Sequence, residues 1–404
     1  LVLATGAAAA IPPIEGIRGA DGGLAPGAFT LRDAVDGRAL TAHLAATPGP
    51  VALVGGGFIG LEVACALARA GREVVVVHSR AWPMHSHLDH DAGRVLLHAL
   101  AGLGIRVVTG ARAVSWGGAA WEGAAWEGSG LRLDDGEVIR CGTVVLSAGT
   151  RPRTAIAEAA GLEVRTGIVV DDALRTSDPA ISALGDCAEH RGCVSGLVSP
   201  AWDQAAVLEA RIGGADPDAR YTGGTEITRL KAFGVDVVSL GSLAGDVHDP
   251  AVEVTVISEP ARGRYARVDV RRDGCGGCCG DGREEAVVEG CGGVGRVVGA
   301  VLVGHPEPVG TLTQLYEHGL PVPDDVVSVL LGRATAAAAE TPATMPAAAV
   351  VCRCNGVSKG DLVTAWGDGA RDAADLAERT RAGTGCGGCA AAVDGICGWL
   401  REAA

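Results

Sequence analysis

One short segment constrains the fold of this chain more than any other. Residues 51–60 read Val-Ala-Leu-Val-Gly-Gly-Gly-Phe-Ile-Gly, an apolar strand that runs into a glycine-rich turn, and an apolar helical pattern follows to Ala70. The next strand, residues 73–77, reads Glu-Val-Val-Val-Val, so strand, turn, helix and strand together match one βαβ unit. This order predicts a parallel sheet that is covered by helices.

The glycines of the turn, Gly55, Gly57 and Gly60, fit the pattern G-x-G-x-x-G. In that pattern the first glycine permits a tight turn, the second lets the backbone approach a pyrophosphate, and the third allows close packing of helix and strand. Phosphates would lie at the helix N-terminus, where free N–H groups and the helix dipole favour anions. The turn therefore predicts a dinucleotide site. Residues 77–80 read Val-His-Ser-Arg without an acidic ribose ligand, so the choice between NADH and NADPH stays open.

Charge and hydropathy argue against two classes of partner. The 404 residues carry 34 basic and 48 acidic side chains, a formal net charge of −14, which is the wrong sign for binding phosphate backbones or anionic lipid. No uncharged apolar run reaches the roughly 18 residues that a membrane-spanning helix needs, and no basic n-region opens the chain. We therefore expect a cytoplasmic protein that binds neither nucleic acid nor membrane.

The cysteines near the C-terminus form two close pairs. Cys352 and Cys354 are separated by one residue, and after a further 31 residues Cys386 and Cys389 follow with two residues between them. Four thiolates in this arrangement suit a metal ion or an iron–sulfur cluster. Zinc is the generic alternative, but the first gap is tighter than the about two to four residues of ordinary zinc sites. The chain's only asparagine, Asn355, and one of its two lysines lie beside these pairs.

The remaining cysteines and histidines carry weaker signals. A glycine-rich loop, which we interpret as an insertion rather than a second metal site, contains Cys275, Cys278, Cys279 and Cys291. Three further cysteines are expected to be structural, namely Cys65, Cys187 and Cys193. Scattered histidines that we do not expect to hold a metal are His85, His87, His90 and His98.

Three other strand ends extend the dinucleotide pattern. Residues 4–6 (Ala-Thr-Gly), 147–149 (Ser-Ala-Gly) and 184–186 (Leu-Gly-Asp) each close an apolar strand. Their order around the glycine turn resembles that of two-dinucleotide flavoprotein reductases, which interleave an FAD domain and an NAD(P)H domain. The resemblance implies that Asp186 bonds the flavin ribityl chain and that Glu62 lies near the nicotinamide and the flavin. It implies further cofactor contacts at Thr5, Gly6, Gly149 and Gly185. No side chain need act as a catalytic nucleophile.

A more specific resemblance covers nearly the whole chain. Residues 354–359 (Cys-Asn-Gly-Val-Ser-Lys) and 380–389 resemble bacterioferritin-associated-ferredoxin-like (BFD-like) domains, which bind [2Fe-2S]. Residues 202–204 and 228–241 resemble the flavoprotein half of the NAD(P)H-dependent nitrite reductase large subunit and the electron-transfer subunit of assimilatory nitrate reductases. This resemblance implies electron transfer from NAD(P)H through FAD and a [2Fe-2S] cluster to a nitrite or nitrate reductase component. The cluster ligands would be Cys352, Cys354, Cys386 and Cys389.

The predicted fold class is α/β, a two-dinucleotide-binding (Rossmann-like, FAD/NAD(P)) flavoprotein fold with an α+β interface domain and a small helical BFD-like module. The expected domains are 1–44, the first part of an FAD-binding domain; 45–146, the NAD(P)-binding domain; 147–218, the second part of the FAD-binding domain; 219–332, the interface domain; 333–349, a linker; and 350–404, the BFD-like domain.

The sequence lacks the first FAD fingerprint of the family. The chain opens at Leu1 without an initiator methionine, and in complete relatives that fingerprint precedes the Ala-Thr-Gly strand. We therefore expect an N-terminally incomplete flavoprotein. Two other functions remain open at this point: a non-catalytic cluster-bearing docking or redox-sensing module, and a reductase for a ferredoxin or a monooxygenase system. The terminal acceptor and the oligomeric state do not follow from the sequence.

Overall fold

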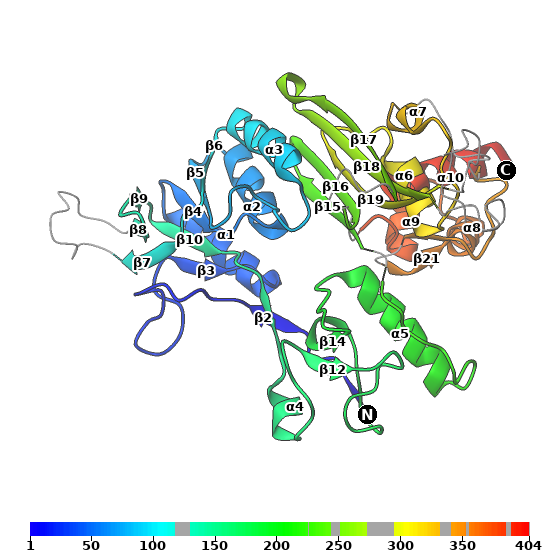
Figure 1. The fold of residues 1–404 in the computed structure, drawn as a ribbon, viewed down its shortest axis with the longest axis horizontal. Helices are drawn as coiled ribbons and strands as arrows, with labels where there is room; N and C mark the ends of the chain where they lie inside the picture. The colour runs from blue at the N-terminus through cyan, green and yellow to red at the C-terminus, as the bar shows by residue number, and fades with distance from the viewer. Residues whose placement is uncertain are drawn as a thin grey trace, which may run out of the picture.

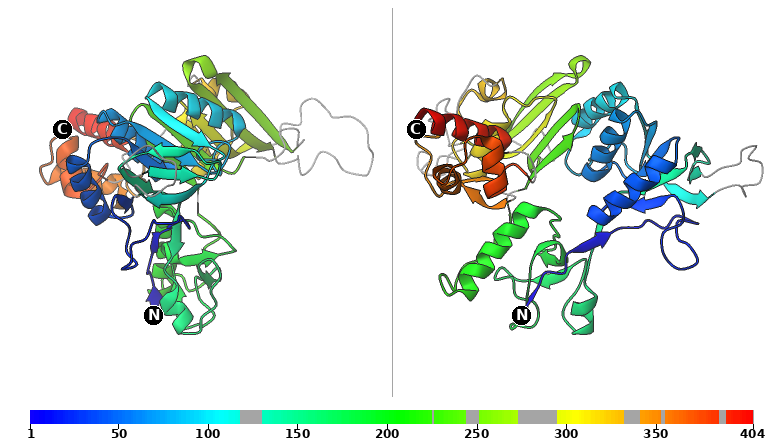
Figure 2. Two further views of the ribbon diagram at one scale, coloured as in Figure 1. Left: turned by 90° about the vertical axis from the view of Figure 1, so that its left-hand side faces the viewer. Right: turned by 180° about the vertical axis from the view of Figure 1, so that it is seen from behind.

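The computed structural model describes residues 1–117, 130–224, 226–243, 251–272, 295–331, 341–352, 355–384 and 389–403. Figure 1 shows a parallel sheet with its helices on the left, a smaller unit around the N-terminus below, and an antiparallel sheet with the C-terminal module on the right. Figure 2 shows the same arrangement from the side and from behind. Across these ranges no helix is long and apolar enough to cross a membrane.

The parallel sheet contains the predicted βαβ unit. Its strands, in spatial order, are β3 (Ala28–Thr30), β10 (Thr143–Leu146), β4 (Val51–Val54), β5 (Val74–His78) and β6 (Ile105–Thr109). Every neighbouring pair is parallel. All residues of β4, β5 and β10 are buried, as expected for central strands that are covered on both faces.

Different structures cover the two faces of this sheet. One face packs against the helices α1 (Ala34–Ala46), α2 (Phe58–Arg69) and α3 (His90–Gly102). The other face packs against an antiparallel sheet of β7 (Ala113–Gly117), β8 (Gly130–Leu133) and β9 (Val138–Arg140). Because the sequence predicts the NAD(P)H site in this unit, we call it the nicotinamide half.

A smaller unit, which we call the flavin half, surrounds the N-terminus. It contains two parallel pairs, β1 (Val2–Leu3) with β13 (Ser182–Ala183) and β12 (Ile168–Val170) with β14 (Ala188–His190). Its helices are α4 (Ala155–Ala159), η1 (Gly185–Cys187) and α5 (Val198–Ile212). An antiparallel pair, β2 (Ala7–Ala9) and β11 (Thr150–Pro152), links the two halves (Figure 1).

The structure moves one predicted boundary. The segment 1–44 was expected to belong to the flavin half, but β3 pairs with β10 and α1 packs on the same sheet. Residues from β3 onward therefore belong to the nicotinamide half. A three-residue strand, Ala-Phe-Thr, carries no periodicity that says which sheet it joins.

The antiparallel interface sheet packs on the helices of the nicotinamide half. Its spatial order is β15 (Ile227–Ala232), β16 (Val235–Gly241), β19 (Gly295–Val303), β18 (Arg264–Arg272) and β17 (Val252–Glu259). Tyr265 donates a hydrogen bond to Asp89 at the start of α3 (2.6 Å), and Arg267 lies between Asp89 and Asp269. The other face is covered by α6 (Val309–Glu317) and α7 (Val326–Leu330), and η2 (Pro260–Arg262) joins β17 to β18.

The C-terminal module has a core of its own. It consists of β20 (Val350–Cys352), β21 (Val357–Ser358), α8 (Lys359–Gly367), α9 (Ala373–Thr380) and α10 (Ala390–Ala403). The residues just before it, expected as linker, are held to it: the backbone N–H of Lys359 donates to Ala349 and that of Gly360 to Ala347. The described end of the expected linker is therefore packed against the module.

Candidate functional site

The three fingerprint glycines lie at the C-terminal end of β4, and two of them are required by packing. Gly55 has a φ of +115°, and a Cβ there would lie 2.1 Å from the carbonyl oxygen of Ser147. A Cβ on Gly60 would lie 2.1 Å from the carbonyl oxygen of Gly55. These approaches hold the turn against β10 and the start of α2 against the turn.

Gly57 differs from its neighbours because its side-chain position is open. Nothing lies within 4 Å of a Cβ built on it, and its φ of −84° suits any residue. Gly57 is the N-cap of α2, and the structure shows no side-chain hydrogen bond capping this helix. An open backbone at an uncapped helix N-terminus is what a bound pyrophosphate needs.

Glu62 follows in the second turn of α2 and is half-buried. Its neighbour Cys65 is buried, and burial, with a smaller contribution from the Glu62 charge, raises the pKa of the Cys65 thiol to about 11. This thiol is therefore neutral at physiological pH, which agrees with the structural role expected for it.

His78, the last residue of β5, forms a hydrogen bond with the glycine turn. Sequence reasoning did not assign it a role. Its ring is 8% exposed, and Nδ1 accepts a hydrogen bond from the backbone N–H of Gly56 at 3.2 Å. Burial, followed by repulsion from His85, lowers the pKa of His78, so the ring stays neutral and able to accept. Arg80, considered for a 2′-phosphate, is exposed beyond the end of β5.

No metal site emerges from the histidines around α3. His78 and His85 have ring centroids 5.4 Å apart, and burial lowers the pKa of His87 as well. Among the described residues, no group of three or more His, Cys, Asp or Glu side chains has a metal-binding arrangement. The loop with Cys275, Cys278, Cys279 and Cys291 lies outside the described residues.

In the flavin half, the structure brings two of the predicted strand ends together. Thr5 donates its hydroxyl to the carbonyl of Arg153 at 2.7 Å, and Gly149 accepts from the backbone N–H of Ala10 at 2.9 Å. Gly6 and Gly149 both have positive φ, +67° and +97°. The two glycines let the chain turn out of β1 and β10 into the β2–β11 pair.

Asp186 lies in η1, at the C-terminal end of β13. Its carboxylate forms an ion pair with Arg32, which follows β3 in the nicotinamide half. The backbone N–H of Gly185 donates to the buried side chain of Gln204 on α5 at 2.7 Å. Arg32 is positioned by its own backbone N–H, which donates to Asp36 at 2.8 Å. Sequence reasoning missed Arg32 because its partner is 154 residues away.

Of the four predicted cluster ligands, the structure describes Cys352 and Cys389. Cys354 and Cys386 lie outside the described residues. Both described thiols are buried and belong to one hydrophobic cluster of the module, together with Cys397 of α10. Two thiols from segments far apart in sequence meet in one core, an arrangement that fits an iron–sulfur cluster between them.

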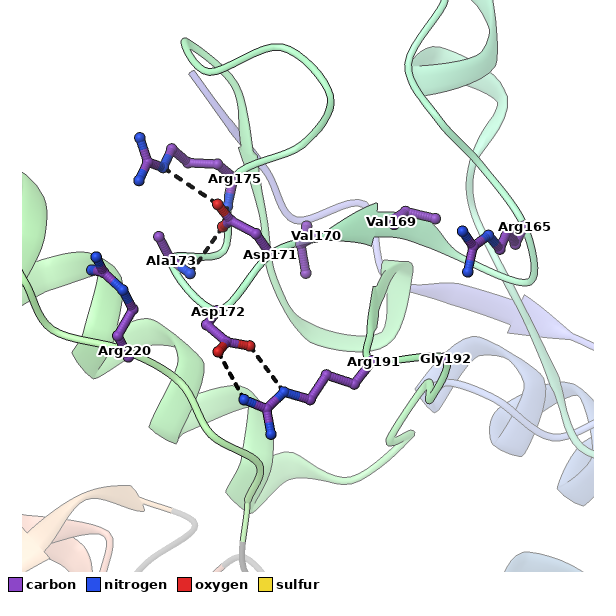
Figure 3. Close-up of a pocket in the computed structure, with 10 residues that line it drawn as sticks. All are labelled: Arg165, Val169, Val170, Asp171, Asp172, Ala173, Arg175, Arg191, Gly192 and Arg220. Carbon is purple, nitrogen blue, oxygen red and sulfur yellow. Dashed lines mark hydrogen bonds and ion pairs between the residues drawn. The ribbon is translucent and has the colours of Figure 1, made fainter.

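A hollow of about 470 Å³ lies in the flavin half beside β12 (Figure 3). Arg191 donates two hydrogen bonds to Asp172, at 2.9 and 2.7 Å, and these with a bond from His190 lower the pKa of Asp172 to about 2. The other guanidinium groups that line it also have carboxylate partners, in the pairs Arg175–Asp171, Arg165–Glu163 and Arg220–Asp218. The hollow therefore offers no uncompensated cation to an anionic ligand.

Two family models match this chain, one over its N-terminal part and one over its C-terminal module. Residues 1–206 match the family Pyridine nucleotide-disulphide oxidoreductase. Residues 350–397 match the BFD-like [2Fe-2S] binding domain. Both matches agree with the resemblances found in the sequence.

Curated relatives extend over most of the chain. The NAD(P)H nitrite reductase large subunit of Klebsiella oxytoca is 33% identical over 399 residues, which are 97% of this chain and 38% of that protein. The assimilatory nitrate reductase electron transfer subunit of Bacillus subtilis is 34% identical over 254 residues, 63% of this chain and 31% of that protein. The chain thus spans less than half the length of these relatives.

Solved structures confirm the predicted fold. The ferredoxin reductase for the CYP199A2 system from Rhodopseudomonas palustris superposes with a TM-score of 0.62 at 25% identity, covering 82% of this chain and 75% of that one. Putidaredoxin reductase in its covalent complex with putidaredoxin gives a TM-score of 0.63 at 22% identity, covering 81% and 72%.

Proposed function

Because the chain belongs to the pyridine nucleotide-disulphide oxidoreductase family and ends in a BFD-like [2Fe-2S] binding domain, we propose that it transfers electrons from NAD(P)H through FAD to the cluster and on to a nitrite or nitrate reductase centre. The family match implies FAD and NAD(P)H, and the module match implies [2Fe-2S]. The relatives at 33% and 34% identity are named as a nitrite reductase subunit and a nitrate reductase electron transfer subunit, which supports a nitrite or nitrate reductase centre as the electron acceptor.

The observation that carries this proposal is the contrast among the three fingerprint glycines. Gly55 and Gly60 pack against backbone, whereas Gly57 opens onto space at the uncapped start of α2. We therefore assign the pyrophosphate of NAD(P)H to this turn and place Glu62 near the nicotinamide.

In the flavin half, we assign Thr5, Gly6 and Gly149 to the wall of the FAD site and Gly185 and Asp186 to the ribityl chain. FAD, when bound, accepts two electrons from reduced nicotinamide and releases them one at a time. The protein's part is to bind and orient. Gln204 holds the backbone of Gly185 in place, and Arg32 holds the Asp186 carboxylate.

We place the four cluster thiolates on Cys352, Cys354, Cys386 and Cys389. The burial of Cys352 and Cys389 in one core supports this assignment. Thiolate ligands and the use of NAD(P)H also support a location in the reducing cytoplasm.

A reductase for a ferredoxin or a monooxygenase system is the second candidate. Rhodocoxin reductase from Rhodococcus erythropolis, 36% identical, supports it but covers 54% of this chain, against 97% for the nitrite reductase relative. The broader coverage favours the nitrite or nitrate reductase type.

Anaerobic reduction of the cluster tests the proposed function. The protein, expressed with its native flanking coding sequence, is mixed with NADH or NADPH and followed by visible absorbance and electron paramagnetic resonance. We expect one of the two nucleotides to reduce flavin and cluster in turn. A cluster that dithionite reduces but neither nucleotide reduces would contradict the proposal.

A further inference from the structure

The side chain of Asn355 joins two segments that adjoin the predicted cluster ligands. Asn355 directly follows Cys354 in the sequence, and Thr384 precedes Cys386 by two residues. The Asn355 amide nitrogen Nδ2 lies 2.5 Å from the carbonyl oxygen of Arg381 and 3.3 Å from the Thr384 hydroxyl. One amide group therefore bridges positions 26 and 29 residues away in sequence.

The accepting carbonyl is aimed by an unusual backbone conformation. Arg381 ends α9 with a φ of +64°, in the left-handed region that non-glycine residues rarely adopt. Its carbonyl also accepts from the Thr384 backbone N–H at 3.2 Å and from the Thr384 hydroxyl at 2.8 Å. The Arg381 carbonyl therefore accepts hydrogen bonds from both Asn355 and Thr384.

The residues that follow Asn355 are also held in place. Gly356 has a φ of +63°, which lets the chain turn back into β21 directly after Asn355. Ser358 and Asp361 then form a capping box at the start of α8. The buried Lys359 donates to the carbonyl of Met345 at 2.6 Å and lies over the ring of Trp399 at 4.7 Å. These contacts hold the backbone directly after Asn355 in place.

The composition of the chain supports a specific requirement at this position. Asn355 is the only asparagine among 404 residues. An aspartate, which is common in this chain, has the same shape but no N–H to donate to the Arg381 carbonyl. An alanine could not span the distance.

From these contacts we propose that Asn355 is a positioning residue for the cluster, whose side-chain amide clamps the segment that follows Cys354 to the segment that precedes Cys386 and so limits how far the two predicted ligand pairs can separate. Such outer contacts orient metal ligands and slow their separation. This inference rests on the cluster of the proposed function, and not on the identity of the acceptor.

The rate of cluster loss tests the clamp. The reconstituted 404-residue chain and its variants Asn355→Ala and Asn355→Asp are exposed to an excess of an iron chelator, and the visible bands of the cluster are followed. We expect both variants to lose the cluster about tenfold faster or more, consistent with losses at outer-shell positions of metal sites. After reduction with dithionite, the electron paramagnetic resonance spectrum of the cluster should also broaden in the variants, because the positions of the thiolates are less constrained.

Arg381→Gly is the matched control. It keeps the carbonyl that Asn355 uses and relieves the left-handed backbone, so its cluster should be lost at the rate of the unmodified chain. If Asn355→Ala does not accumulate as folded protein, Thr384→Val replaces it in the test, because this variant removes the second partner of the same amide. We expect Thr384→Val to lose the cluster faster than the unmodified chain. Variants that keep both the unmodified loss rate and the unmodified spectrum would overturn the clamp. An unmodified chain that takes up no iron and sulfide would overturn the clamp and the proposed function together.

Discussion

The nicotinamide half and the flavin half each contain a strand that ends in a glycine turn, β10 and β1, but the two strands differ in the number of their neighbours. β10 ends in Ser-Ala-Gly149 and has a parallel neighbour on each side, β3 and β4. β1 ends in Ala-Thr-Gly6 and, in the described part of the chain, pairs with β13 alone. Both strands turn at a glycine of positive φ into the same β2–β11 pair.

The two proposed cofactor sites also differ in the groups that line them. In the nicotinamide half, the proposed site is made of backbone: a glycine turn, an open N-cap and a helix N-terminus, all between β4 and α2. In the flavin half, the described residues of the proposed FAD site supply polar side chains, among them Asp186 and Gln204. The two sites should therefore respond differently to substitution.

The largest expected effect is at Gly57. Because a Cβ there has no protein atom within 4 Å but lies where we place the pyrophosphate, Gly57→Val should leave the fold intact and weaken NAD(P)H binding by about 100-fold, equivalent to about 2.7 kcal/mol. Nucleotide binding is measured by titration calorimetry and the fold by thermal unfolding. Cluster assembly should be unaffected.

Two other glycines make this prediction specific. Gly102→Val, at the end of α3 and also in open space, should not change nucleotide binding. Gly60→Ala should instead destabilise the protein, by about 1–3 kcal/mol, because its methyl group would lie against the Gly55 carbonyl. Equal nucleotide affinity of Gly57→Val and the unmodified chain would refute the fingerprint assignment.

The next effect separates the two halves. Asp186→Ala removes a carboxylate of the flavin half, and we expect roughly tenfold weaker FAD binding, about the 1.4 kcal/mol of one charge-assisted hydrogen bond. NADH and NADPH affinity should not change. Since the Asp186–Arg32 pair is partly exposed, its loss should cost no more than about 1 kcal/mol of stability.

The comparison for this variant is Asp218→Ala, whose carboxylate is almost fully exposed. Flavin fluorescence quenching gives the affinities. A variant at Asp186 that binds FAD as well as the Asp218 variant would remove the ribityl assignment.

The fold was largely predictable because its signals are local. The βαβ unit follows from apolar runs and glycines within thirty residues, and the C-terminal module follows from the resemblance of the residues around two close cysteine pairs to BFD-like domains. The assignment of β3, the ion pair of Arg32 with Asp186 and the hydrogen bond of His78 with Gly56 were not predictable. Each depends on groups that only the folded chain brings together, and none leaves a periodic or spacing signal.

The smallest expected effect is a pH dependence confined to the nicotinamide half. The unfolded chain protonates His78 near its ordinary pKa of 6.5, whereas burial and His85 lower that pKa in the folded protein. The unfolded state thus binds more protons, and stability is lost as pH falls from about 6.5 toward the folded pKa. Protonation would also end the hydrogen bond from Gly56.

His78→Asn tests this dependence, because its side-chain oxygen can accept from Gly56 without titrating. Urea unfolding between pH 7.5 and pH 5 should show a smaller loss of stability in the variant than in the unmodified chain. Some loss should remain, because burial also lowers the pKa of His87. Identical slopes for both proteins would contradict the role of His78.

The central claim is that the nicotinamide half binds NAD(P)H and that the C-terminal module holds a [2Fe-2S] cluster. The most direct test is the cofactor content and nucleotide affinity of the 404-residue chain purified on its own. We predict two irons and two sulfides per chain and measurable binding of NADH or NADPH. A chain that binds neither nucleotide, or that holds zinc without labile sulfide, would contradict the account.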